Sequence, residues 1–245
     1  MKEPIETLLL DFGGTLDADG VAWKERFYAF YQDEGLDMAA DVFASSFFAA
    51  DDPLVGGLAP AADLSETVHA LVANLEAELG RRGAGADQAG IVNGRNEGDR
   101  GERIASRFLS EASAVFARNR PVLEALKKRY RLGVISNFYG NLAAVCRGAG
   151  LAPLFSALVD SHCVGAEKPD PAIFRAALDA LRATPETTVL VGDSLRRDGE
   201  GARRIGMRFA WMVPPGGEAA GAQAAAAPPV EYAVTGLRDL MKILP

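Results

Sequence analysis

The stretch that decides the fold is Leu8-Leu9-Leu10-Asp11-Phe12-Gly13-Gly14-Thr15, near the start of a chain of 245 residues. Its leucines form an apolar run of the kind that is buried as a central strand of a parallel sheet. The two glycines permit a sharp turn directly afterwards, and such a turn leaves backbone N–H groups free to face an anion. We therefore expect Asp11 at the carboxyl end of a strand, where open α/β sheets bind their ligands.

Three further segments follow in a fixed order. They are Leu132-Gly133-Val134-Ile135-Ser136-Asn137, then Glu167-Lys168-Pro169-Asp170-Pro171, then Val189-Leu190-Val191-Gly192-Asp193-Ser194 with Asp198 beyond it. The first and third are apolar runs that end in polar side chains. The second places one lysine just before a proline that can begin a helix.

Together the four segments resemble the motifs of the haloacid dehalogenase-like (HAD) hydrolase superfamily, from about Leu8 to Ala210. The resemblance implies an α/β fold: a doubly wound, parallel-sheet (Rossmann-like) core with an inserted α-helical cap domain. It also implies the strand order 3-2-1-4-5, which places the Asp11 strand between the strands of Ser136 and Asp193. Residues far apart in the sequence would then meet at one edge of the sheet.

The hydrophobic pattern along the chain predicts how the domains are arranged. Strand patterns occur at about Thr7–Asp11, Leu132–Ser136, Ala157–Val159, Thr188–Val191 and Arg208–Met212. Helical patterns separate them, which favours a parallel sheet with helices on both faces. Residues 19–118 have helical periods and no strand alternation, so we assign them to the cap and assign 1–18 and 119–245 to the core. Within these domains, Gly83–Arg100 and the Ala-, Gly- and Pro-rich Gly216–Pro229 are predicted to be loops.

The composition is that of an ordinary globular protein with an acidic balance. The net charge of −7 and the pI near 5.0 argue against nucleic acid or an anionic membrane as a main partner, although a small anionic substrate remains compatible. No apolar segment approaches the ~20 residues that span a bilayer. The first residues lack a signal-peptide layout, and Cys146 and Cys163 lack metal-binding spacing, so we predict a cytoplasmic protein. The sequence gives no indication of its oligomeric state.

Asp11 and Asp193 are candidates for phosphoryl chemistry with a metal ion. A strand-end aspartate among N–H groups is a plausible nucleophile toward phosphorus. A phosphate and a carboxylate repel each other, and Mg²⁺ takes one or two carboxylates as ligands. The resemblance implies an aspartyl-phosphate at Asp11, a further metal ligand in the carbonyl group of Gly13, and an outer-shell role for Asp198. Asp198 could also be a helix-dipole partner.

The remaining candidates would bind the phosphate group. Ser136 offers a hydroxyl group and Asn137 a backbone N–H, and we add the turn at Gly14 and Thr15. Lys168 is a compact cation suited to neutralising the nucleophile and the developing charge.

Gly13 departs from the family pattern. Phosphatases of this family usually carry an aspartate two residues after the nucleophile, where it serves as general acid and base. General acid–base help is typically worth 10²–10⁴-fold, so its loss should be costly. Asp17 and Asp19 are the nearest substitutes, and each could equally be a solvated loop carboxylate.

The leading interpretation is a hydrolase, a Mg²⁺-dependent phosphatase that acts on a small phosphorylated metabolite. One alternative is a haloacid dehalogenase-like hydrolase, which lacks the second aspartate, attacks carbon and needs no metal. Another is a catalytically impaired regulatory protein that binds phosphate.

Overall fold

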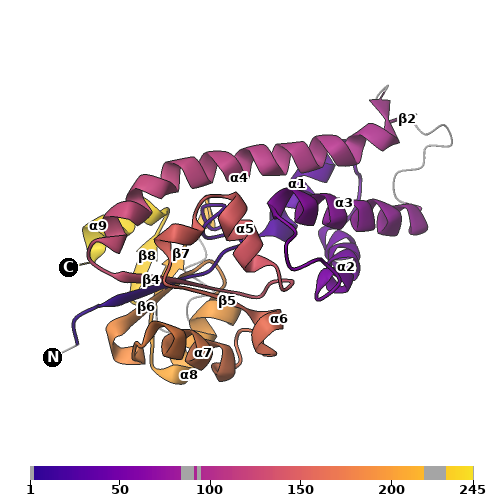
Figure 1. The fold of residues 1–245 in the computed structure, drawn as a ribbon. Coiled ribbons are helices and arrows are strands. Elements are labelled where there is room, and N and C mark those ends of the chain that lie inside the picture. The colour runs from indigo at the N-terminus through magenta and orange to yellow at the C-terminus, as the bar shows by residue number, and fades with distance from the viewer. Residues whose placement is uncertain (1–2, 84–90, 93–94, 218–229, 245) are drawn as a thin grey trace.

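The computed structural model describes residues 3–83, 91–92, 95–217 and 230–244. One sheet forms the core, with six parallel strands in the order β5-β4-β1-β6-β7-β8 (Figure 1). Its strands are β1 (Thr7–Leu10), β4 (Arg131–Ser136), β5 (Ala157–Asp160), β6 (Thr188–Gly192), β7 (Arg208–Met212) and β8 (Tyr232–Val234). The predicted strand order is confirmed, with β1 in the centre and one additional strand at the edge.

Helices cover both faces of this sheet. In chain order the α-helices are α1 (Trp23–Asp33), α2 (Ala40–Asp51), α3 (Leu64–Arg81), α4 (Glu97–Lys127), α5 (Leu142–Gly148), α6 (Ser161–Val164), α7 (Pro171–Leu181), α8 (Glu200–Ile205) and α9 (Leu237–Ile243). Short helical turns add η1 (Asp52–Leu54), η2 (Ala152–Leu154), η3 (Pro185–Thr187) and the π-helical η4 (Leu195–Gly199). In Figure 1, α4, α5 and α9 lie on one side of the sheet, and α7 and α8 lie on the other.

The alternation of side chains along β1 explains why both faces are covered. Leu8 and Leu10 belong to the apolar cluster that continues into the cap, whereas Leu9 packs in a second cluster with Ile173 and Phe174 of α7. All three leucines have no exposed surface. A strand that is apolar on both faces is stable only in the middle of such a sandwich.

The register brings the carboxyl ends of three strands to one level. Leu10 pairs with Val134 of β4 and with Val191 of β6. Asp11 therefore follows β1 at the edge where β4 ends in Ser136 and β6 is followed by Asp193. The topology alone brings these three polar residues together.

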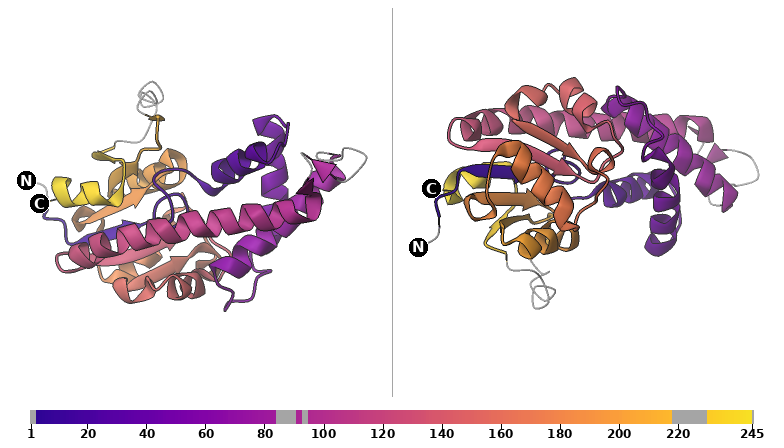
Figure 2. Two further views of the ribbon diagram at one scale, coloured as in Figure 1. Left: turned by 90° about the horizontal axis from the view of Figure 1, so that it is seen from above. Right: turned by 60° about the horizontal axis from the view of Figure 1, so that its bottom comes forward.

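Helices α1, α2 and α3 pack beside this edge, and α4 runs from them along the whole core (Figure 2). The predicted boundary at residue 118 falls inside α4, which continues through Pro121 to Lys127. The prediction of a loop over Gly83–Arg100 is wrong at its end, because α4 already begins at Glu97. Arg100 in its first turns is buried, and its Nε donates to Glu76 of α3 at 3.0 Å, which stabilises the helix start.

Two other expectations need correction. The 19–118 region is not purely helical, since β2 (Ile91–Val92) and β3 (Arg95–Asn96) form a short antiparallel ribbon. The three-residue edge strand β8 was also missed, because so short a run carries no recognisable period. The predicted loop at Gly216–Pro229 lies outside the described residues from 218 onward.

Among the described helices, none combines the length and apolar character needed to cross a membrane.

Candidate active site

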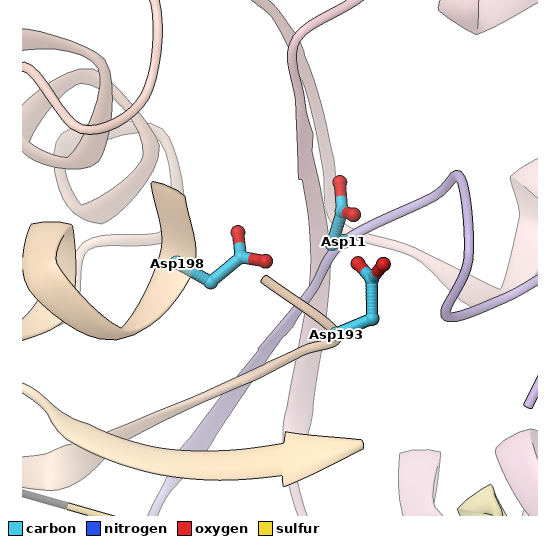
Figure 3. A group of neighbouring side chains, drawn as sticks. All are labelled: Asp11, Asp193 and Asp198. Carbon is cyan, nitrogen blue, oxygen red and sulfur yellow. The ribbon is translucent and has the colours of Figure 1, made fainter. Parts of the chain in front are cut away.

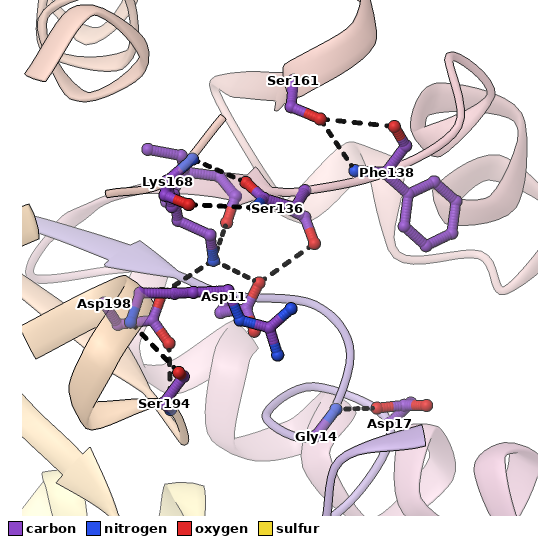
Figure 4. A network of polar contacts seen from close by, with 12 residues as sticks. Asp11, Gly14, Asp17, Ser136, Phe138, Ser161, Lys168, Ser194 and Asp198 are labelled. Atoms are coloured by element: carbon purple, nitrogen blue, oxygen red, sulfur yellow. Dashed lines mark hydrogen bonds and ion pairs between the residues drawn. The ribbon is translucent and has the colours of Figure 1, made fainter. Parts of the chain in front are cut away.

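Lys168 joins two carboxylates at the carboxyl edge of the sheet. Its Nζ lies 2.7 Å from Asp11 Oδ1 and 2.7 Å from Asp198 Oδ1, and it also donates to the Ile135 carbonyl at 3.2 Å. Ser136 Oγ donates to the same Asp11 oxygen at 3.0 Å (Figure 4). All four side chains are at least nine-tenths buried, so the orientation of Asp11 is fixed from two sides.

The backbone of Lys168 is held by the side chain of Asn137. Asn137 Oδ1 accepts from the Lys168 N–H at 2.7 Å, and its Nδ2 donates to the Lys168 carbonyl at 3.1 Å. Burial alone would lower the pKa of Lys168, but Asp11 and Asp198 together raise it. Lys168 is therefore a permanent cation, and Asn137 acts here through its side chain in positioning that cation.

Asp193 completes a group of three carboxylates with Asp11 and Asp198. One oxygen of each lies within 4.8 Å of the others, and Figure 3 shows the side chains of Asp11 and Asp193 close together. Asp193 Oδ1 is buried and has no hydrogen-bond partner among the described residues. Burial, together with Asp11 and Asp198, raises the pKa of Asp193 well above its usual value. A buried acceptor without a donor, facing a second carboxylate, is the arrangement that a cation would satisfy.

Asp198 differs from Asp193 because both its oxygens have partners. Oδ1 accepts from Lys168, and Oδ2 accepts from the Ser194 N–H at 3.1 Å. Its close approach depends on Gly192, where a Cβ would lie 2.4 Å from Asp198 Oδ2. This need for glycine at the last residue of β6 was missed from the sequence. Because both oxygens of Asp198 already accept hydrogen bonds, Asp198 is suited to hold the groups around a metal ion. Asp193, whose Oδ1 has no hydrogen-bond partner among the described residues, is the better candidate for a direct metal ligand.

The turn after Asp11 uses its N–H groups differently from the prediction. The Gly14 N–H donates to Asp17 Oδ1 at 2.7 Å and the Thr15 N–H to the Phe12 carbonyl at 3.2 Å, so neither is free for an anion. The Thr15 side chain is fully buried, and its hydroxyl has no partner among the described residues. Among the described residues of this turn, only the backbone N–H groups of Phe12 and Gly13 have no hydrogen-bond acceptor.

Gly14 has a structural reason to be glycine. Its φ of +88° is in the left-handed region, and a Cβ there would lie 2.6 Å from Asp193 Oδ2. Gly14 thus allows Asp193 to pack directly against the turn of the nucleophile motif.

Asp17 is neither a solvated loop carboxylate nor a free acid. It is completely buried and accepts from the Gly14 N–H, from Trp23 Nε1 at 2.6 Å and from Arg26 Nη1 at 3.0 Å. Burial raises its pKa, and Arg26 lowers it. Neither Trp23 nor Arg26 was predicted in this role, because residues 19–118 showed only the helical periods of a cap. Asp19 pairs instead with Arg118 at 2.7 Å.

Gly13 lies against the indole ring of Trp23. A Cβ on Gly13 would lie 3.2 Å from Trp23 Nε1 and 3.4 Å from its Cδ1. The backbone of Gly13 is outside the left-handed region, so the limit on a larger residue here comes from Trp23. The aromatic ring occupies space next to the position where the family's phosphatases usually carry an aspartate.

A cavity of about 800 Å³ opens between the sheet edge and the cap. It is lined by core residues that include Asp11, Gly13, Ser136, Asn137, Lys168 and Asp193, together with Trp23, Phe47, Phe48, Tyr139, Asp51, Arg196 and Arg197. Neither Asp17 nor Asp19 lines it, and neither do Gly14 and Thr15. Tyr139 Oη donates to Asp51 Oδ1 at 2.5 Å, which connects the end of α2 to the core.

Comparison with known proteins agrees with this geometry. The family model of the haloacid dehalogenase-like hydrolases matches residues 5–206. The chain belongs to this family.

Curated relatives of this HAD-like hydrolase match over part of their length. A bovine (Bos taurus) protein named haloacid dehalogenase-like hydrolase domain-containing protein 3 is 34% identical over 122 residues, 49% of each chain. A phosphoserine phosphatase of Thermus thermophilus is 48% identical over 112 residues, 45% of this chain and 43% of the relative. The chain thus matches about half the length of these relatives.

The family resemblance extends to the fold. The crystal structure of a 2-haloacid dehalogenase from Pseudomonas syringae pv. Tomato DC3000 is 24% identical, with a TM-score of 0.52 over 98% of both chains. At this identity the likeness concerns the fold alone, so the chemistry has to be argued from the site.

Proposed function

We propose that this chain is a Mg²⁺-dependent phosphatase that hydrolyses small phosphorylated metabolites through an aspartyl-phosphate at Asp11. The observation that carries the proposal is the buried, partnerless Asp193 Oδ1 beside Asp11. A hydrolase that attacks carbon without a metal has no need for a second carboxylate there. A metal-dependent phosphatase needs one, and the phosphatase named among the relatives points the same way.

In this proposal the Asp11 and Asp193 carboxylates and the Gly13 carbonyl hold Mg²⁺, and Asp198 supports the site from outside. The bound ion would offset the charge of the carboxylates and polarise the phosphoryl oxygens. The donor set fits, because Mg²⁺ prefers oxygen ligands and usually takes one or two carboxylates. Asp198 keeps its bonds to Lys168 and Ser194, which restrict it to an outer position.

Asp11 attacks phosphorus, a bond forms between its carboxylate oxygen and phosphorus, and the bond to the ester oxygen breaks. Lys168 and Ser136 hold the attacking carboxylate, and the free N–H groups of Phe12 and Gly13 can donate to phosphoryl oxygens. The leaving oxygen takes a proton from water, because Gly13 supplies no acid. Water then hydrolyses the acyl phosphate, which releases phosphate and regenerates Asp11.

The experiment that tests the proposal is a phosphatase assay with p-nitrophenyl phosphate, in Mg²⁺ and in excess chelator. We expect activity only with Mg²⁺ and a loss of at least about 10³-fold in Asp11→Asn, since the nucleophile is removed. The matched control is Asp19→Asn, which removes a nearby carboxylate that pairs with Arg118 outside the cavity.

Three outcomes separate the alternatives. Full phosphatase activity in chelator would contradict the metal site, and hydrolysis of 2-haloacids in chelator would favour a dehalogenase. Binding of beryllium fluoride that needs Mg²⁺ and Asp11, without any turnover, would instead indicate a regulatory protein.

A further inference from the structure

Two arginines in the wall of the cavity have no ion-pair or hydrogen-bond partner for their guanidinium groups among the described residues. Arg196 and Arg197 are exposed and line the cavity, and neither guanidinium group has an ion pair or hydrogen bond within the described residues. The next arginines along the chain behave differently, because Arg203 and Arg204 both pair with Glu200, at 2.7 and 3.0 Å. Free guanidinium groups facing a cavity are therefore a specific feature of this turn.

The position of Arg197 connects the metal-binding end of the cavity with the cap. Arg196 and Arg197 belong to η4, between Asp193 and Asp198. Both arginines line the same cavity as Asp11 and as Asp51, the last residue of α2.

The other charged groups of the cavity are largely compensated by neighbours. Lys24 pairs with Glu25 at 3.1 Å and Asp11 pairs with Lys168, whereas Asp51 accepts only from the neutral hydroxyl group of Tyr139. Asp11 and Asp193 would in addition face the metal. Apart from Asp193, the lining acids without an ion pair among the described residues are Asp51 and the exposed Glu167. The two exposed guanidinium groups are therefore the groups on this side of the cavity that can bind an anion.

We propose that Arg196 and Arg197 form a subsite for a carboxylate group of the substrate, so that the preferred substrates are phosphomonoesters of small carboxylic acids. This inference rests on the proposed phosphatase function. The phosphoryl group itself is accounted for by Asp11, Lys168 and the N–H groups of the turn. A guanidinium group matches a carboxylate in shape and can bind it through two hydrogen bonds.

The test compares substrates that differ only in the second anion. 3-Phosphoglycerate has a carboxylate where glycerol 3-phosphate has a hydroxymethyl group, and phosphoserine has one where phosphoethanolamine has hydrogen. In wild type we expect kcat/KM to be higher for the carboxylate member of each pair. Arg197→Gln should lower kcat/KM for the carboxylates by about tenfold to a hundredfold, the usual effect of losing a hydrogen bond to a charged group. Its effect on the neutral members should stay below about threefold.

The control variants separate charge from fold. Arg203→Gln removes an arginine of α8 that pairs with Glu200 away from the cavity, and it should change neither substrate class. Arg197→Lys keeps the charge and should restore part of the preference. The double variant with Arg196→Gln shows whether both residues contribute.

Two results would overturn the subsite. One is an equal loss on both members of each pair, which would mean that Arg197 binds the phosphoryl group. The other is an unchanged preference in the double variant. Hydrolysis of p-nitrophenyl phosphate in all these proteins keeps the subsite test distinct, because failure of the phosphatase function itself would abolish that signal.

Discussion

The core wall of the cavity holds buried charges, whereas the cap wall opposite holds aromatic rings. On the core side, Lys168 lies within hydrogen-bond distance of two carboxylates that sit on separate strands and turns of the sheet. On the cap side, Trp23 packs edge-on against Phe108 of α4 at a centroid distance of 4.9 Å, and it reaches Phe138 of the core at 6.0 Å. The core wall is thus stabilised by paired charges and the cap wall by packing. The two walls meet at Gly13, and they should respond differently to mutation.

Removing the cation of the core wall should have the largest effect. In Lys168→Met, Asp11 and Asp198 remain buried without their common partner. Loss of one partner from a buried pair typically costs 3–5 kcal/mol, so we expect a loss of about 5 kcal/mol in the free energy of unfolding and no phosphatase activity. Denaturant unfolding measures the first quantity. Lys242→Met, at an exposed pair with Asp239, is the matched control and should change it by less than about 0.5 kcal/mol.

The same variant should also show a characteristic pH dependence. Burial raises the pKa of Asp198 and Lys168 lowers it, so removing Lys168 raises this pKa further. A carboxyl group whose pKa is raised in the folded state favours the protonated form, so the deficit of the variant should shrink as the pH falls from the alkaline to the acidic side of neutral. The stabilising contribution of Lys168 in wild type is constant over this range, because its raised pKa lies above the ordinary 10.5. A deficit that grows toward low pH would contradict the pairing.

The carboxylate that joins the two walls should have the next largest effect. Asp17→Asn removes the negative charge and replaces one acceptor oxygen by an NH₂ group, which then faces either the Gly14 N–H or the donors of Trp23 and Arg26. We expect a loss of about 3 kcal/mol in the free energy of unfolding, because the buried guanidinium group of Arg26 loses the nearer of its two carboxylate partners, Asp17 at 3.0 Å, and keeps only Glu111 at 3.7 Å. Asp19→Asn, two residues along at the more exposed pair with Arg118, should lose less than about 1 kcal/mol. If Asp17→Asn and Asp19→Asn lose the same free energy of unfolding, the hydrogen bonds of Asp17 to Trp23 and Arg26 do not hold the turn against the cap.

The contrast between the walls also explains what the sequence could predict. Asp11, Ser136 and Asp193 come together because parallel strands end at one edge of the sheet. The strand order that does this was implied by the family resemblance, and so was the approach of Lys168, which lies between α6 and α7. The role of Asp17 did not follow, because its partners Trp23 and Arg26 lie on a cap helix whose packing depends on three-dimensional contacts. Gly14 was predicted to present its N–H to an anion, but its conformation instead makes room for Asp193. Arg196 and Arg197 carry no sequence signal, since paired and unpaired arginines look alike in a sequence.

The smallest expected effect concerns Gly13, where the two walls meet. Without an acid here, wild-type rates should fall steeply as the pKa of the leaving alcohol rises, so alkyl phosphates are slow and aryl phosphates faster. Gly13→Asp should flatten this dependence and raise alkyl-ester turnover by about tenfold. This gain is below the usual 10²–10⁴-fold contribution of general acid–base catalysis, because the new side chain must displace Trp23, only 3.2 Å from its Cβ.

Gly13→Ala supplies the matched control, because it adds the same Cβ without a carboxylate. Its backbone cost is small, since Gly13 lies outside the left-handed region, and the crowding against Trp23 should cost about 1 kcal/mol of stability. The measurement is a rate series against leaving-group pKa for wild type and both variants. A gain in Gly13→Ala equal to that in Gly13→Asp would trace the effect to movement of Trp23. A shallow slope already in wild type would mean that another group of the cavity supplies the proton, and Asp51 is then the first residue to substitute, because its carboxylate lines the cavity and burial raises its pKa.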